Sequence, residues 1–170
     1  RARRLLEVFI ADVLDSPSPW VAVDTETRPS VPHRSALQPR YTKLTAIGLA
    51  TEKRAISLSW RVVGKLARDH LRRFFSIPQL RFVAHNAMYD LGIMERGLST
   101  KPIRYPYSIP PKILTRVSWL RNIKVEDTLA LAYCQGEEDL SLKGLMQKYL
   151  GVNTDTYPYA RIGEEQAHGQ

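Results

Sequence analysis

The sequence has a single cysteine, Cys134, among its 170 residues. A disulfide framework and a zinc site built from cysteines are therefore excluded. Apolar runs stay well short of the roughly 18–20 residues that a membrane-spanning helix needs, so we expect no membrane association. The chain starts at Arg1, without a methionine or a secretory apolar segment. We therefore expect an intracellular protein and a fragment of a larger chain, and one cysteine fits a reducing compartment.

Acidic residues are scarce in the middle of the chain. Between residues 27 and 124 there are 19 Lys and Arg against four Asp and Glu, whereas residues 126–170 hold three basic and eight acidic residues. A polyanionic partner such as nucleic acid would meet the basic middle of the chain rather than its end. An ordinary solvated basic surface is the alternative, and charge alone does not decide between the two.

Periodicity predicts an α/β fold. No repeat and no long Gly/Ser linker divides the sequence, so it reads as a single domain over residues 1–170. Helical spacing of apolar residues predicts helices over 2–14, 65–76, 89–97, 128–134 and 141–150. Short apolar or alternating runs predict strands over 20–23, 43–50, 54–60, 81–84 and 123–125. The order favours a mixed sheet of about five strands, the first three a meander, flanked by helices.

Several single residues carry local predictions. Gly97 and Gly151 are expected to end helices, and Ser141 is expected to cap one at its start. Asp127 is expected to cap the helix that follows it. Cys134 lies on an apolar stripe and is expected in the core.

Two carboxylates, Asp24 and Glu26, directly follow the apolar run at residues 20–23. Positions two apart in a strand point to the same face, so these side chains would lie side by side. Like charges that close are costly unless a cation lies between them, and oxygen ligands favour hard ions such as Mg²⁺ or Mn²⁺. The alternative is a solvated pair in a loop, which the two residues alone do not exclude.

A third carboxylate, Asp90, falls in the first turn of the helix after the strand at residues 81–84. The polar turn between them contains His85 and Asn86. If this strand lies parallel to the first one, Asp90 reaches the same sheet edge as Asp24. Asp90 would then join the metal site, while its alternative role is to stabilise the positive end of the helix.

The motifs together resemble a known family. Val23-Asp24-Thr25-Glu26-Thr27 and Ala84-His85-Asn86-Ala87-Met88-Tyr89-Asp90 are similar to the first two motifs of the DEDD-type 3′→5′ exonucleases. The segments Glu126-Asp127-Thr128-Leu129-Ala130-Leu131-Ala132-Tyr133 and Leu140-Ser141-Leu142-Lys143-Gly144-Leu145 resemble the proofreading domains of family A DNA polymerases. The resemblance covers roughly residues 18–155 and rests on the order and spacing of these segments.

This resemblance implies a ribonuclease H-like fold and a two-metal mechanism, with Asp24, Glu26 and Asp90 holding two Mg²⁺ or Mn²⁺ ions. It implies that the partners are the 3′ end of single-stranded DNA and the polymerase domain of the same parent protein, at the site of DNA replication. It further implies that Asn86 contacts the 3′-terminal nucleotide and that Thr25 offers its backbone N–H to it. His85 and Tyr89, beside Asn86, would help to hold the strand.

The family's third motif, Tyr-x-x-x-Asp or His-x-x-x-Asp, is missing. Tyr157 and Tyr159 have no Asp four residues later, and His168 is followed by only two residues. We expect that the chain ends before this motif or that the site is incomplete and inactive. Asp127 and Asp155 are weaker candidates for the missing carboxylate.

Two long loops rich in proline and basic residues, at 28–42 and 98–118, are expected to bind the nucleic-acid strand. The candidate contacts are Arg28, Arg34, Arg40, Lys101, Arg104 and Lys112. The alternative is a surface that docks on the rest of a polymerase. Two other functions stay open: an inactive exonuclease fold that binds DNA or braces a polymerase, and a stand-alone RNA exonuclease.

Overall fold

The computed structural model describes residues 2–18, 20–30, 42–99 and 123–153. The elements are α1 (Ala2–Leu14), β1 (Trp20–Pro29), β2 (Thr42–Ala50), β3 (Ala55–Ser59), α2 (Lys65–Phe75), β4 (Arg81–Ala84), α3 (Ala87–Leu98), β5 (Val125–Asp127), α4 (Thr128–Cys134) and α5 (Leu142–Leu150). Their order is the predicted one. The chain divides into two compact units, residues 1–128 and 129–170, so a single domain over the whole chain stays a prediction.

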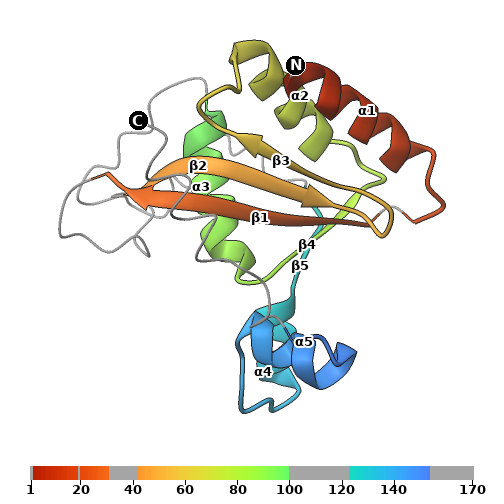
Figure 1. The fold of residues 1–170 in the computed structure, drawn as a ribbon, viewed down its shortest axis with the longest axis vertical. Helices are drawn as coiled ribbons and strands as arrows, with labels where there is room; N and C mark the ends of the chain where they lie inside the picture. The colour runs from red at the N-terminus through yellow and green to blue at the C-terminus, as the bar shows by residue number, and fades with distance from the viewer. Residues whose placement is uncertain (1, 19, 31–41, 100–122, 154–170) are drawn as a thin grey trace. The chain divides into compact units, whose positions relative to one another are not determined.

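The five strands form one mixed sheet in the order β3-β2-β1-β4-β5 (Figure 1). β1, β2 and β3 pair antiparallel as a meander. β4 lies parallel to β1, and β5 lies parallel to β4. These findings confirm the predicted α/β class. They also place the carboxyl ends of β4 and β5 beside the middle of β1, since Ala22 is opposite Val83 and Ala84 is opposite Asp127.

The core of the first unit lies on one face of the sheet. Along β1, Val21 and Val23 are buried and belong to the same apolar cluster as residues of α1, α2 and α3. Phenylalanines form its centre, with ring centroids 6.1 Å apart for Phe9 and Phe74 and 5.7 Å apart for Phe74 and Phe82, both edge to face. This arrangement is the preferred one for aromatic rings. The alternate residues of β1, which include the acidic pair, lie on the opposite, exposed face.

Several predicted boundaries differ from the structure. β1 continues to Pro29 because residues 24–29 keep pairing with β2, so the acidic pair lies within the strand rather than after it. β5 spans Val125–Asp127 instead of 123–125. α3 runs through Gly97 to Leu98. A Cβ at Gly97 would lie 2.6 Å from Leu44 Cδ2, so this glycine allows close packing on β2 and does not end the helix.

In the second unit, the predicted caps of α5 are confirmed. The Ser141 side chain accepts a hydrogen bond from the Gly144 N–H at 3.0 Å, and Gly151 ends the helix with φ of +65°. The prediction for Cys134 was wrong, because its side chain is exposed. In the described ranges of the chain, no helix is long and apolar enough to cross a membrane.

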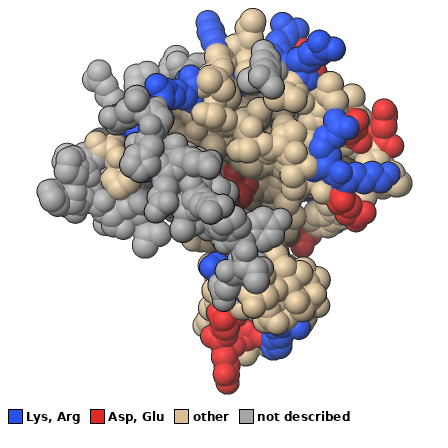
Figure 2. Space-filling view, viewed as in Figure 1, with Lys and Arg blue, Asp and Glu red and all other residues tan. Residues whose placement is uncertain are grey.

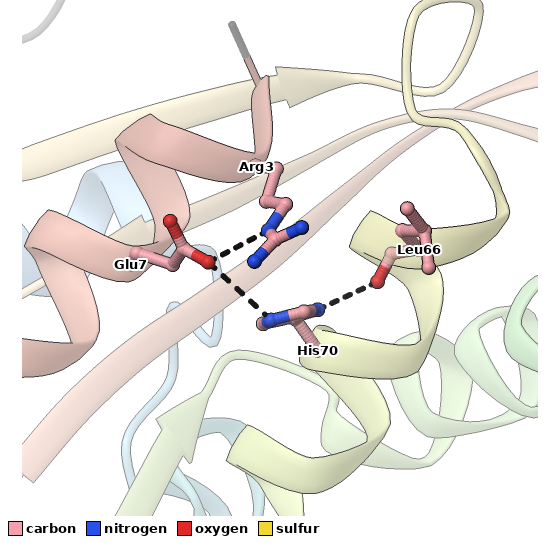
Figure 3. Close-up of polar contacts among 4 residues, drawn as sticks. All are labelled: Arg3, Glu7, Leu66 and His70. Carbon is pink, nitrogen blue, oxygen red and sulfur yellow. Dashed lines mark hydrogen bonds and ion pairs between the residues drawn. The ribbon is translucent and has the colours of Figure 1, made fainter.

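A small polar cluster joins α1 to α2 (Figure 3). Glu7 Oε1 accepts a hydrogen bond from Arg3 Nε at 2.7 Å and lies 3.5 Å from His70 Nε2. His70 Nδ1 lies 2.7 Å from the carbonyl oxygen of Leu66, which can only accept, so Nδ1 donates. These side chains are partly or largely solvent-exposed, whereas the apolar face of α1 beside them is buried.

We expect the apolar face of α1, rather than this polar cluster, to hold the helix in place. Glu7→Gln should change the free energy of unfolding little, because exposed ion pairs contribute little. Val13→Ala, which removes two methyl groups from a side chain that is 1% exposed, should cost about 1.5 kcal/mol or more. Urea denaturation of the two variants measures both changes. A larger loss for Glu7→Gln than for Val13→Ala would contradict this assignment.

Candidate active site

Asp24 and Glu26 lie on the exposed face of β1, as their spacing predicts. Their cross-strand partners on β2 are Gly48 and Ala46, the two smallest residue types. A Cβ at Gly48 would lie 3.9 Å from the Asp24 Cβ, an ordinary van der Waals contact. Small neighbours thus leave space around both acids. Figure 2 shows acidic side chains near the middle of the visible face, among uncharged ones.

Asp90 is in the first turn of α3 and is only 4% exposed. Its Oδ1 accepts two hydrogen bonds from Thr25, one from the backbone N at 3.1 Å and one from Oγ1 at 2.5 Å. The N–H of Thr25 was predicted to contact the terminal nucleotide. In the structure it donates to Asp90 instead, because α3 brings that carboxylate to the edge of β1.

Burial raises the pKa of the Asp90 carboxyl from its ordinary 3.8 to about 6. The side-chain hydrogen bond from Thr25 opposes this rise, since it favours the charged form, and the negative charge of Asp24 adds to it. The charge of Asp127 contributes in the same direction. The structure therefore brings Asp24 and Asp127 within electrostatic reach of Asp90.

The turn between β4 and α3 carries the other predicted residues. His85 Nδ1 lies 2.9 Å from Thr128 Oγ1. Asn86 is exposed and has φ of 71°, in the left-handed region. The hydroxyl of Tyr89 lies 2.9 Å from Thr27 Oγ1, which ties α3 to β1 beside the acidic pair. The predicted contacts of these side chains with a nucleotide stay predictions.

The structure shows contacts of Asp127 that the sequence did not predict. Both of its carboxylate oxygens accept backbone N–H groups from the start of α3, Asn86 at 2.9 Å and Ala87 at 2.8 Å. The predicted cap of the following helix, α4, stays a prediction. Parallel pairing explains the contacts with α3, since Ala84 and Asp127 are opposite each other at the ends of β4 and β5. The parallel pairing of β4 and β5 could therefore have indicated the contact of Asp127 with the start of α3.

The basic candidates fall mostly outside the described part of the chain. Arg28 is exposed on β1, close in sequence to the acidic pair. The other five, Arg34, Arg40, Lys101, Arg104 and Lys112, lie in ranges that the structure does not describe. Asp155, a candidate for the missing carboxylate, lies outside them as well.

A complete metal site is not assembled within residues 2–18, 20–30, 42–99 and 123–153, because no three Asp, Glu, His or Cys side chains there are close enough to hold an ion. The described part contains an exposed acidic pair on β1. It also contains the buried Asp90, which is bonded to Thr25 of the same strand and has a raised pKa. A strongly shifted pKa beside another charge is typical of functional sites.

A model of the 3′–5′ exonuclease family matches residues 2–160, nearly the whole chain. The chain belongs to this exonuclease family. Members of the DEDD group of these exonucleases typically depend on divalent metal ions. A search among curated protein sequences gave no match.

Solved structures show the fold of this exonuclease chain. The EXO domain of Nibbler from Aedes aegypti has a TM-score of 0.60 and 13% identity over 89% of this chain and 66% of that one. NrnC of Brucella melitensis bound to pGG has a TM-score of 0.56 and 17% identity over 83% of this chain and 57% of that one. The catalytic core of RRP6 from Trypanosoma brucei has a TM-score of 0.60 and 14% identity over 94% of this chain and 36% of that one. These neighbours confirm the predicted ribonuclease H-like fold, and the exonuclease chain spans less than two thirds of each.

Proposed function

We propose that the chain is the 3′→5′ exonuclease domain of a DNA polymerase and hydrolyses the 3′-terminal phosphodiester of single-stranded DNA. The observation that supports this most is that the buried Asp90 of α3 is bonded to Thr25, between the exposed Asp24 and Glu26, and lies within electrostatic reach of Asp24. The polymerase context rests on the resemblance of the segments at 126–133 and 140–145 to family A proofreading domains.

The donor chemistry of the site fits divalent cations. Asp24, Glu26 and Asp90 offer only oxygen ligands, as Mg²⁺ and Mn²⁺ prefer. Mutual repulsion between the Asp24 and Asp90 charges, together with burial, is a cost that a bound cation would relieve. Among the described residues these three side chains are not grouped closely enough to hold an ion. In the metal-bound protein they would come together around two ions, which would supply Lewis acidity toward water and phosphate oxygens. One of the structures with the same fold, NrnC with a TM-score of 0.54, contains bound Mg²⁺.

The chain's own residues would bind and orient the strand. Asn86 and His85, in the turn before α3, and Tyr89, in the first turn of the helix, would contact the terminal nucleotide. The hydrogen bond between Tyr89 and Thr27 fixes that aromatic ring against β1. Arg28 is exposed further along the strand and would contact a phosphate.

The test is release of a labelled nucleoside monophosphate from a 3′-labelled single strand by the full-length parent protein, with Mg²⁺. A circular single strand of the same composition is the control and should stay intact, because it has no 3′ end. Release without any metal, or no release at all, would contradict the proposal. The second result would favour the inactive, DNA-binding alternative.

A stand-alone RNA exonuclease is the second candidate. The Trypanosoma brucei RNase D structure, solved in complex with RNA U12, shares the fold with a TM-score of 0.60 at 10% identity, covering 89% of this chain and 45% of that one. The sequence itself shows no residue dedicated to a ribose 2′-hydroxyl. Competition between DNA and RNA strands of equal length separates the candidates, because a DNA exonuclease should be inhibited poorly by RNA.

Nucleic-acid binding should weaken steeply with salt. The basic middle of the chain would hold the strand through its phosphates, and each released counterion makes the affinity depend on salt. With about four phosphate contacts, the affinity for a single strand should fall roughly 50-fold between 50 and 200 mM salt. Fluorescence anisotropy in EDTA measures this without cleavage. An affinity that stays flat over this range would contradict the assignment of the basic loops.

A further inference from the structure

The end of β5 contacts the turn that leads into α3. Asp127 accepts the N–H of Asn86 on Oδ1 at 2.9 Å and the N–H of Ala87 on Oδ2 at 2.8 Å. The first amides of a helix have no partner within it, so this carboxylate satisfies two of them. Its negative charge also lies at the positive end of the helix.

The turn needs such support because its backbone is unusual. Asn86 has φ of 71° and ψ of 53°, and it is the one non-glycine residue with positive φ in the described part of the chain. The left-handed conformation is unfavourable for a residue with a Cβ, although asparagine tolerates it best. Its side chain forms no hydrogen bond that caps α3. The conformation is therefore stabilised by Asp127, which accepts the N–H groups of Asn86 and Ala87.

Thr128, the next residue, contacts the same turn on its other side. Its Oγ1 donates to the carbonyl oxygen of Ala84 at 3.3 Å and lies 2.9 Å from His85 Nδ1. A hydroxyl has one proton, and a carbonyl oxygen can only accept. Both hydrogen bonds form together only if His85 Nδ1 carries the proton and donates to Oγ1. In neutral His85 the other nitrogen, Nε2, is then an acceptor.

We propose that Asp127 and Thr128 are positioning residues for the nucleotide-binding turn. Asp127 holds Asn86 in its left-handed conformation, and Thr128 keeps the proton of His85 on Nδ1. The two residues thereby set which way Asn86 points and make His85 Nε2 a hydrogen-bond acceptor. This inference rests on the proposed function, in which His85 and Asn86 contact the 3′-terminal nucleotide.

Asp127→Asn tests the first half. An amide side chain accepts only through its single oxygen, so one of the two backbone contacts is lost. We expect faster amide hydrogen exchange at Asn86 and Ala87 and a Kd for oligo(dT) in EDTA that is raised about tenfold, in the range found for lost supporting hydrogen bonds. Removing a negative charge near DNA would by itself lower the Kd. A lost positioning contact would raise the Kd, so the direction of the change separates the two explanations.

Glu126→Gln is the matched control, because it removes the same charge from an exposed neighbour on β5. It should leave amide exchange in the turn unchanged and bind oligo(dT) at least as tightly as the unmodified chain. If Asp127→Asn behaves like Glu126→Gln in both measurements, the positioning role of Asp127 is wrong.

Thr128→Val and Thr128→Ser test the second half and do not depend on Asp127. Valine keeps the shape without the hydroxyl, whereas serine keeps the hydroxyl. In ¹⁵N NMR spectra at neutral pH, His85 should show a protonated Nδ1 in the unmodified chain and in Thr128→Ser. In Thr128→Val the proton should redistribute toward Nε2. An unchanged tautomer in Thr128→Val overturns this half of the proposal.

The binding and NMR measurements use the full chain without metal, so they are independent of catalysis. A chain that binds oligo(dT) and shows the expected changes, but never cleaves with Mg²⁺, would support the positioning roles and contradict the proposed exonuclease function. If the unmodified chain cleaves normally and Asp127→Asn and Thr128→Val both keep its KM, the exonuclease function is supported and the positioning roles are contradicted.

Discussion

Replacing Asp24 and Glu26 together with alanine is expected to abolish exonuclease activity while leaving the fold intact. Both side chains are exposed on β1 and belong to no apolar contact of the core, so their loss leaves the packing unchanged. Without them, the proposed cations would lose two of their three described ligands. We expect cleavage of a 3′-labelled single strand to fall by roughly 10³-fold or more, because metal ions supply several kcal/mol of transition-state stabilisation.

The matched control is Asp15→Ala with Glu52→Ala, which removes the same number of exposed carboxylates near the turn between β2 and β3. This variant should cleave at the unmodified rate. Both double variants should bind a single strand in EDTA at least as well as the unmodified chain, since each loses two negative charges. If the Asp24 and Glu26 variant degrades the strand normally, the proposed site is wrong.

Much of the fold follows from local patterns in the sequence. The apolar run at residues 20–23 predicts a buried strand, and Val21 and Val23 do lie in the core. The spacing of Asp24 and Glu26 predicts that they share one face of the strand, and both are exposed. The caps of α5 are equally local, because Ser141 and Gly151 act within one helical turn. Such features depend on neighbours in the chain, so a single sequence is sufficient to predict them.

The parts of the site that the sequence does not predict depend on contacts between distant residues. The Thr25 N–H reaches Asp90 across 65 positions, and Asn86 reaches Asp127 across 41. Which donor meets which carboxylate depends on the register of β1, β4 and β5, and a shift of one residue would change every partner. Gly97 shows the same limit, because its packing against Leu44 of β2 cannot be distinguished in the sequence from a helix stop.

Asp90→Asn should stabilise the metal-free chain at neutral pH. Burial raises the pKa of this carboxyl in the folded state from 3.8 to about 6. Below pH 4 the group is protonated in both the folded and unfolded states, so folding carries no penalty from it. As the pH rises through 6, the folded state must hold a buried charge, and the stability that the protonated form provided is lost.

An asparagine can keep both hydrogen bonds from Thr25, because its Oδ1 accepts as Asp90 Oδ1 does, and it never ionises. The free energy of unfolding in EDTA should therefore exceed that of the unmodified chain by about 2–3 kcal/mol at pH 7.5, from about 1.4 kcal/mol per pKa unit. The difference should shrink toward zero at pH 4. Urea denaturation at the two pH values measures it, with the exposed Asp15→Asn as a control that should show no such pH dependence.

Magnesium should reverse the order of stability. A cation bound beside Asp90 favours the ionised carboxylate, so the melting temperature of the unmodified chain should rise with Mg²⁺ concentration, as for any ligand that binds the folded state. Asp90→Asn removes one ligand charge and should show a smaller rise, together with a large loss of cleavage. A variant that is less stable than the unmodified chain in EDTA at pH 7.5 would mean that the Asp90 carboxylate stabilises the fold without a metal. Asp90 would then be a structural partner of Thr25, and the third ligand would have to be sought elsewhere.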